Sequence, residues 1–399
     1  MAKEKGTNRR DFLKKMGLLG AAGAGSMAFG KRALAADPPG GGQEIYTVDD
    51  NEKGEALNLF VWSGYDADNV VNPFRKRYDC KVTVELLTSD PDAIMKLKAG
   101  ATNTFDIITL NNCWSKEMYR DKLIIELDEA TFRPYFDKMP SLFKWPFEWA
   151  MSDDGKLIGM PQRYGTFNMV INNKKISTQT AQQEAWQLPM DPKNKGRWAL
   201  VNWDNWALYH MCQSAGVYPF KKHTDEEMDK VEEAAFKWFE NCKFVTESDI
   251  EVNNALLAGE IDWYMPGGTY TASAPRAEGH WEVEAISPRV GSLKGGVGSI
   301  MWIELTNIIN NPKVSSLADD YLAYMQEPEA SYNIAIADNT HNAVANMADP
   351  KVMAMFSKDE LKSIQWDTFE EDISYSDFYQ DNPDYHKMMR FYRRAKAAR

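Results

Sequence analysis

The stretch LNLFVW at residues 57–62 opens the repeating pattern that decides the fold. It predicts a buried strand, which a Ser-Gly pair breaks, and an amphipathic helix follows over residues 70–78. The pattern continues with the alternating strand KVTVEL (81–86), the helix PDAIMKLKAG (91–100) and the buried strand FDIITL (105–110). Strands that alternate with helices predict a parallel sheet with right-handed crossovers, and therefore an α/β fold.

A second unit of the same kind follows along the chain. We expect strands over residues 167–172, 197–202, 260–265 and 301–306, a long helix over 225–242 and a helical tail over 385–398. A chain of 399 residues exceeds the size of one ordinary core, so two domains are the natural expectation.

The first 35 residues predict an exported protein. Paired arginines, Arg9 and Arg10, precede FLK at 12–14, a weakly apolar Gly-rich run covers 17–30, and ALA at 33–35 offers small residues for cleavage. These three parts in this order are typical of a twin-arginine signal peptide, and the apolar run is too short to span a membrane. We expect residues 36–54, rich in Pro, Gly and Asp, to form a flexible leader of a periplasmic protein.

The predicted mature chain is strongly acidic. Removing residues 1–35 takes away eight Lys/Arg and two acidic residues, which changes the formal net charge from −12 to −18. This charge argues against nucleic acid and anionic membranes as partners and favours a cationic small molecule, although acidity for solubility alone explains it equally well.

Motifs for catalysis, cofactors or metals are missing from the sequence. The five histidines are scattered, and none lies in HExxH or at metal-ligand spacing from a cysteine or aspartate. There is no GxSxG elbow, no P-loop and no complete dinucleotide glycine loop. The four cysteines form no CxxC pair, so buried free thiols are expected. We therefore expect no cofactor, no metal site and no enzyme.

Aromatic residues gather where the predicted strands end. A ring face beside a carboxylate is how a protein holds an alkylammonium group, because cation–π attraction and an ion pair act on the same charge. Any one of these rings can simply fill the core, but their recurrence at the same position in both halves favours a binding site. They are Trp62, Tyr65, Trp114, Trp203, Trp206, Trp263, Tyr264 and Trp302.

Six motifs occur in order along the predicted mature chain: LFVWSGY (59–65), MKLKAG with FDII (95–108), DPKNKGRWAL (191–200), LAGEID (257–262), MWIE (301–304) and an aromatic-basic C-terminal helix. In this order and spacing they resemble the extracellular solute-binding proteins of ABC transporters, in particular the spermidine/putrescine-binding group. The resemblance covers nearly the whole predicted mature chain.

This resemblance implies an α/β, two-lobe periplasmic binding protein fold with a ligand cleft between the lobes. One lobe would comprise residues 50–158 with 302–345, and the other residues 163–297 with 348–399. The chain would cross between them near Pro161 and Gly298.

The resemblance also implies the residues of the site. Asp204 matches the family's amine-binding acid in the second lobe, and Glu304 stands where the family has Asp. Ala207 replaces a second acid, so a ligand with one cationic end and one polar or carboxylate end would suit the site. Arg163 could pair with such a carboxylate, although a structural salt bridge is the simpler expectation. The full predicted set is Trp62, Tyr65, Asn111, Trp114, Asp204, Tyr264, Trp302 and Glu304.

We therefore expect a monomeric periplasmic protein that captures a polyamine or related amine and delivers it to the membrane subunits of an ABC permease. Alternatives are a binder of an amino-acid-like zwitterion, a phosphonate or ferric iron, a protein that presents its ligand to a chemoreceptor, and a twin-arginine-exported enzyme. Ferric sites usually need adjacent tyrosines, whereas Tyr321 and Tyr324 are expected on one helix face in the core.

Overall fold

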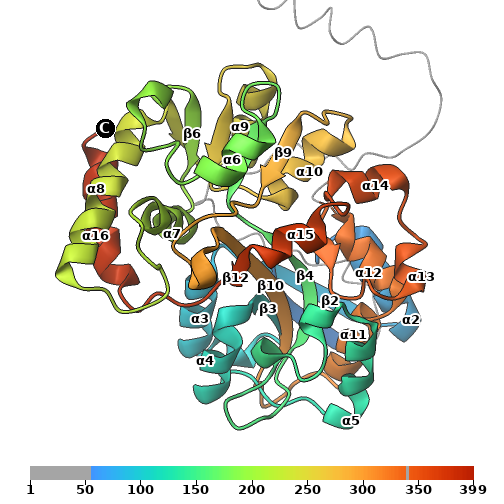
Figure 1. Cartoon of the computed structure of the whole chain (residues 1–399). Helices are drawn as coiled ribbons and strands as arrows, with labels where there is room; N and C mark the ends of the chain where they lie inside the picture. The colour runs from blue at the N-terminus through green and yellow to red at the C-terminus, as the bar shows by residue number, and fades with distance from the viewer. Residues whose placement is uncertain (1–54, 338–340) are drawn as a thin grey trace, which may run out of the picture. The chain divides into compact units, whose positions relative to one another are not determined.

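Two β-sheets organise the protein, whose computed structural model describes residues 55–337 and 341–399 (Figure 1). The predicted signal peptide and leader therefore lie outside the described residues. The larger sheet has the order β11-β4-β10-β3-β1-β2, with β12 paired to β10, and the smaller sheet has the order β7-β6-β8-β5-β9.

The larger sheet contains β1 (Ala56–Val61), β2 (Lys81–Leu86), β3 (Ile107–Asn111), β4 (Met160–Thr166), β10 (Ser299–Ile308), β11 (Ala343–Val344) and β12 (Ser376–Phe378). The helices that lie between these strands in the chain include α2 (Asp68–Tyr78), α3 (Asp90–Lys98), α4 (Ser115–Arg120), α5 (Glu129–Phe132), α11 (Ala318–Met325), α12 (Pro328–Ala335), α13 (Pro350–Met353) and α15 (Phe369–Ser374).

The smaller sheet contains β5 (Met169–Asn172), β6 (Trp198–Val201), β7 (Phe244–Thr246), β8 (Trp263–Met265) and β9 (Val283–Ile286). The helices that accompany it are α6 (Thr178–Glu184), α7 (Asp204–Ser214), α8 (Asp225–Asn241), α9 (Asp249–Leu257), α10 (Thr269–Ala277), α14 (Lys358–Ser363) and α16 (Tyr385–Ala397). The C-terminal helix α16 packs along α8, as Figure 1 shows.

The opening strand-helix pattern forms the parallel sheet that the sequence predicts. β1 pairs in parallel with β2 on one side and with β3 on the other. α3 begins after Ser89, whose hydroxyl accepts a hydrogen bond from the Asp92 backbone N–H at 3.2 Å, and Pro91 occupies its first turn. The carboxyl ends of β1 and β3 therefore meet at one edge of the sheet, where binding sites of α/β sheets form.

β10 is the element that brings distant parts of the chain together. All ten of its residues are buried, and it pairs antiparallel with both β3 and β4. The chain passes from the larger sheet to the smaller between Thr166 and Met169 and returns between Ile286 and Ser299. Gly298 is the last residue before β10, so it lies on the segment that returns to the larger sheet. Pro161 lies inside β4, a few residues before the chain first leaves that sheet.

Residues 348–399 are divided between the two sheets. β12 pairs in parallel with β10 of the larger sheet, although residues 348–399 were expected with the other lobe. In the same segment, α14 packs on α10 and α16 packs on α8, both beside the smaller sheet, whereas α13 packs on α12 and α15 on β10 and β12. The division of the chain into two moving lobes at the stated boundaries stays a prediction.

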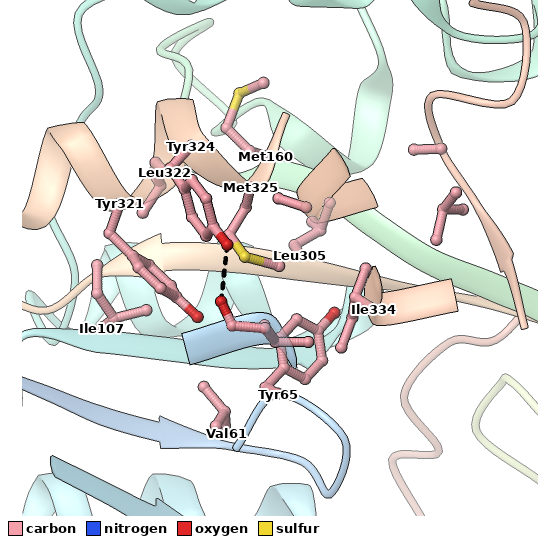
Figure 2. Close-up of a cluster of buried hydrophobic side chains, with 14 of the residues drawn as sticks. Val61, Tyr65, Ile107, Met160, Leu305, Tyr321, Leu322, Tyr324, Met325 and Ile334 are labelled. Carbon is pink, nitrogen blue, oxygen red and sulfur yellow. Dashed lines mark hydrogen bonds between the residues drawn. The ribbon is translucent and has the colours of Figure 1, made fainter. Parts of the chain in front are cut away.

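The core of the larger sheet includes the tyrosines of α11. Figure 2 shows Tyr321 and Tyr324 among aliphatic side chains, and the Tyr324 hydroxyl donates to the Val70 carbonyl at 2.7 Å. The expectation that these two tyrosines are core residues is confirmed. Three of the four cysteines, Cys80, Cys212 and Cys242, are buried too, and none of the four is paired with another. Within residues 55–337 and 341–399, no helix has the length and apolar character needed to cross a bilayer.

Candidate ligand-binding site

A buried ion pair lies at the junction of β10 and β4. The Arg163 guanidinium donates to both carboxylate oxygens of Glu304, from Nε to Oε2 and from Nη2 to Oε1, each at 2.9 Å. The Tyr65 hydroxyl also donates to Glu304 Oε2, at 2.7 Å, and the Arg163 guanidinium lies 4.6 Å from the centre of the Tyr65 ring. Only 6% of each charged side chain is exposed, so the two charges neutralise each other inside the protein.

The backbone explains why these residues meet. The register of β10 with β4 shifts between Ile303 and Leu305, so two residues of β4 face Glu304 alone, and Arg163 is one of them. Gly64, with φ at 98°, lets the loop after β1 approach, since a Cβ there would lie 2.9 Å from Arg163 Nη1. The same guanidinium nitrogen donates to the Ser63 carbonyl at 3.0 Å. The salt-bridge expectation for Arg163 is confirmed.

A second buried carboxylate, Asp90, lies at the start of α3. Its Oδ2 accepts hydrogen bonds from Asn111 Nδ2 at 2.7 Å and from Trp114 Nε1 at 3.2 Å, and its Oδ1 faces the Asn111 backbone N–H at 3.4 Å. Asp90 is only 3% exposed, and this burial raises the pKa of its carboxyl to about 6, although the hydrogen bonds from Asn111 act in the opposite direction and lower it. Within the described part of the chain, no Lys, Arg or His side chain forms an ion pair with it.

Sequence reasoning missed Asp90, because a Ser-Asp-Pro run at the end of a strand indicates only the beginning of a helix. The structure gives it a further environment. Burial raises the pKa values of Cys113 and Tyr379, and the nearby charge of Asp90 raises both further. The charge of Glu304 in the same way adds to the raised pKa of Asp90. Asn111 lies directly opposite Glu304 in the β3–β10 pairing. Asp90 therefore belongs to the same edge of the sheet as the buried ion pair.

An aromatic layer, which we define by Phe167, Trp203, Trp206, Tyr270, Trp302 and Tyr379, joins elements of both sheets. Trp203 stacks on Phe167 with 5.5 Å between ring centres and on Tyr270 with 5.9 Å, and Trp206 lies 4.7 Å from Tyr379. Trp203, Trp206 and Tyr270 belong to the region of α7 and α10, whereas Trp302 is on β10.

Tyr379 is held from both sides. Asn112, which follows β3, donates to its carbonyl at 2.8 Å, and Asn205 of α7 donates to its hydroxyl at 3.3 Å. A residue near the C-terminus of the chain thus links the two sheets at the aromatic layer. No sequence signal points to this role of Tyr379.

The predicted site residues fall into three groups. Tyr65, Asn111, Trp114 and Glu304 gather around the ion pair and Asp90, and Trp302 belongs to the aromatic layer. Trp62, half-buried after β1, packs on both cores of the larger sheet, and its buried Nε1 finds no hydrogen-bond partner among the described residues.

Two predicted residues are not brought to this group. Tyr264 is buried in the core of the smaller sheet, where its hydroxyl donates to Asn253 Oδ1 at 2.9 Å and lies 3.0 Å from Thr271 Oγ1. We therefore leave Tyr264 out of the site proposed below. Asp204 is the first residue of α7, next to Trp203, but its side chain lies outside the described part of the structure.

Comparisons with known proteins find similarity over most of the chain. A family model described as bacterial extracellular solute-binding protein matches residues 69–362. The spermidine/putrescine-binding periplasmic protein 1 of Haemophilus influenzae is 23% identical over 350 residues, which are 82% of this chain and 88% of that protein.

Two solved structures are similar across the same range. The spermidine/putrescine ABC transporter substrate-binding protein PotD of Streptococcus pneumoniae superimposes with a TM-score of 0.65 at 15% identity, over 86% of this chain and 100% of that chain. An ABC transporter substrate-binding protein of Bradyrhizobium japonicum gives a TM-score of 0.61 at 15% identity, over 86% and 99%. These similarities show the two-lobe α/β fold that the sequence predicts. Because the family model covers most of its length, the chain belongs to the bacterial extracellular solute-binding proteins.

Proposed function

We propose that this protein captures a small organic cation, a polyamine or related amine, and delivers it to the membrane subunits of an ABC permease. The similarity to a protein named for spermidine and putrescine binding supports this ligand class. The observation that carries the proposal is the aromatic layer, which contains the rings of Trp203, Trp206 and Trp302 and joins elements of both sheets. Two other members of the layer, Tyr379 and Tyr270, lie close enough to the carboxylates of Asp90 and Glu304, respectively, for these charges to raise their pKa values. Rings and carboxylates together form the surface that an alkylammonium ligand needs.

Binding would act through closure of the two lobes. Because the aromatic layer takes residues from elements of both sheets, a ligand that contacts it favours the arrangement in which these elements meet. Closure also removes water from the ligand's charge, which strengthens its attraction to a carboxylate. The proposal includes no catalytic step.

The compartment and route belong to the same proposal. Export through the twin-arginine route, suggested by Arg9 and Arg10, would place a monomeric protein in the periplasm, where such ligands are collected. A ligand carboxylate bound by Arg163 receives no support, since Glu304 already occupies that guanidinium with two hydrogen bonds. Tyr324, with its hydroxyl donated to a backbone carbonyl in the core, likewise offers no support for a ferric site.

Isothermal titration calorimetry on the chain without its first 35 residues tests the ligand class. We expect putrescine or spermidine to bind, and glycine betaine, glutamate and methylphosphonate to bind far more weakly. Trp302→Ala should weaken amine binding about tenfold, because one cation–π contact in a dry site contributes about 1–2 kcal/mol. Circular dichroism would confirm that the variant folds. Binding of the phosphonate or the zwitterions in preference to every amine would overturn the proposal.

A further inference from the structure

The family resemblance assigns Glu304 to the ligand, but in the structure its carboxylate is paired with Arg163. Arg163 forms two hydrogen bonds with it and Tyr65 a third, so three donors already serve the two carboxylate oxygens. All three side chains are buried. An ammonium group that displaced Arg163 would leave a guanidinium charge buried without its counterion, which is a large free-energy cost.

Asp90 is in the opposite situation. It is a buried carboxylate whose hydrogen-bond partners, Asn111 and Trp114, are neutral. Oδ2 accepts two hydrogen bonds, whereas Oδ1 has only the long 3.4 Å contact with a backbone N–H and keeps acceptor capacity. A charge buried among neutral donors is costly for the free protein and is offset when a cation arrives.

We propose that Asp90, and not Glu304, holds a primary ammonium group of the ligand on the larger-sheet side of the site. This inference rests on the proposed function and adds the counter-charge to it. Trp114 would play a double part, because its Nε1–H fixes Asp90 Oδ2 while its ring, half-buried beside the same edge, is available to the ligand's methylenes. The Arg163–Glu304 pair, whose charges compensate each other, lines the site without binding the ammonium group.

Calorimetry with putrescine as the probe tests this assignment through three variants. Asp90→Asn keeps the size of the side chain and an acceptor oxygen but removes the charge, and should weaken binding about 30-fold or more. Asp92→Asn is the matched control, since it removes the same charge from the same first turn of α3 at an exposed position, and should change affinity less than about threefold. The double variant Arg163→Met/Glu304→Leu removes the ion pair as a whole and keeps the net charge of the site, so it should leave the affinity of the folded protein within about fivefold of wild type.

Each outcome decides the point. Asp90→Asn with wild-type affinity overturns the inference and leaves the proposed function standing, and so does a folded Arg163→Met/Glu304→Leu variant that no longer binds. A wild-type protein that binds no amine overturns the proposed function, and the inference with it.

Proton release gives a second measurement that needs no variant. The pKa of Asp90 in the free protein is raised to about 6 by burial, so at pH 5 its carboxyl carries a proton. An ammonium group favours the ionised form and lowers this pKa, so binding at pH 5 should release close to one proton, and binding at pH 8 none. The charged or titratable groups that face Asp90 are Glu304, Cys113 and Tyr379, and the latter two have pKa values raised well above this range. Comparison of binding enthalpies in two buffers of different ionisation enthalpy measures the release; equal release at both pH values contradicts the inference.

Discussion

At the scale of single residues, the site is decided by which buried charge has a partner. Arg163 and Glu304 are both almost fully buried and satisfy each other, and the shift in the β4–β10 register puts them face to face. Such a pair is not by itself evidence of stability, because removing two charges from water costs as much as their attraction gains. Removing only one partner is strongly destabilising, because the other charge stays buried without its counterion.

Arg163→Met should therefore destabilise the protein strongly, by about 3–5 kcal/mol, because it leaves the Glu304 carboxylate buried without its cation. The double variant Arg163→Met/Glu304→Leu should recover much of that loss. Urea unfolding followed by circular dichroism measures both. Arg77→Met is the control, since Arg77 pairs with Glu327 at 2.6 Å on the surface and such pairs contribute about 1 kcal/mol or less. A single variant no less stable than this control would show that the ion pair is not isolated from water.

At the scale of elements, α14 is fastened to the smaller sheet by a few side chains. The buried Arg276 of α10 donates to the carbonyls of Lys362 and Ser363 at 2.6 and 3.2 Å, at the end of α14 where the helix dipole is negative. Gln365 then pairs with the edge of β9, accepting from the Ala285 N–H at 2.7 Å and donating to its carbonyl at 2.9 Å. These contacts tie a segment that follows β11 of the larger sheet to the smaller sheet.

Arg276→Met should loosen this segment without disturbing the site. The substitution leaves the carbonyls at the end of α14 without their buried donor, so amide hydrogen exchange over residues 358–365 should become at least tenfold faster. Arg197→Met, which removes a half-exposed arginine paired with Asp262 on the same sheet, should leave that exchange unchanged. Unaltered protection in Arg276→Met would mean that Gln365 and the packing of α14 suffice.

At the scale of the whole molecule, one pair of tryptophans lies in the core of the smaller sheet and another pair lies in the aromatic layer. Trp198 and Trp238 are completely buried in the core of the smaller sheet, 5.3 Å apart and edge to face. Trp302 and Trp206 belong to the aromatic layer that joins the two sheets. A change in how the two sheets meet therefore alters the surroundings of Trp302 and Trp206, and not those of Trp198 and Trp238.

Tryptophan emission should report ligand binding for this reason. We expect putrescine to change the emission of the wild-type protein, and we expect Trp238→Phe to keep that change. Trp302→Phe and Trp206→Phe should each lose a large part of it, because these rings exchange water for ligand and neighbouring rings on closure. Titrations followed by steady-state fluorescence make the comparison. A ligand-induced change carried by Trp238 would instead place the response in the core.

Much of the fold was predictable because its signals are local. The parallel unit formed by β1, α2, β2, α3 and β3 follows from hydrophobic periodicity and from the helix start at Ser89 and Pro91. The site was predictable only in part. Tyr65, Asn111 and Trp114 could be placed at one edge of the sheet because they lie at or just after the ends of β1 and β3, and their role in ligand binding stays a prediction. Tyr264 also lies near a strand end, but its side chain belongs to the core of its own sheet. Alternation along a three-residue strand does not tell which face meets the other sheet.

The sequence by itself determined the strand and helix order, the edge of the sheet at which polar and aromatic residues collect, and the family of solute-binding proteins. Only the tertiary structure decided which of the acids at that edge is free to take a cation. Arg163 and Glu304 are separated by 141 positions in the sequence, and Asp90 and Asn111 by 21. The charge that a buried carboxylate offers depends on its partners in space, and those partners come from strands that only the folded sheet places side by side.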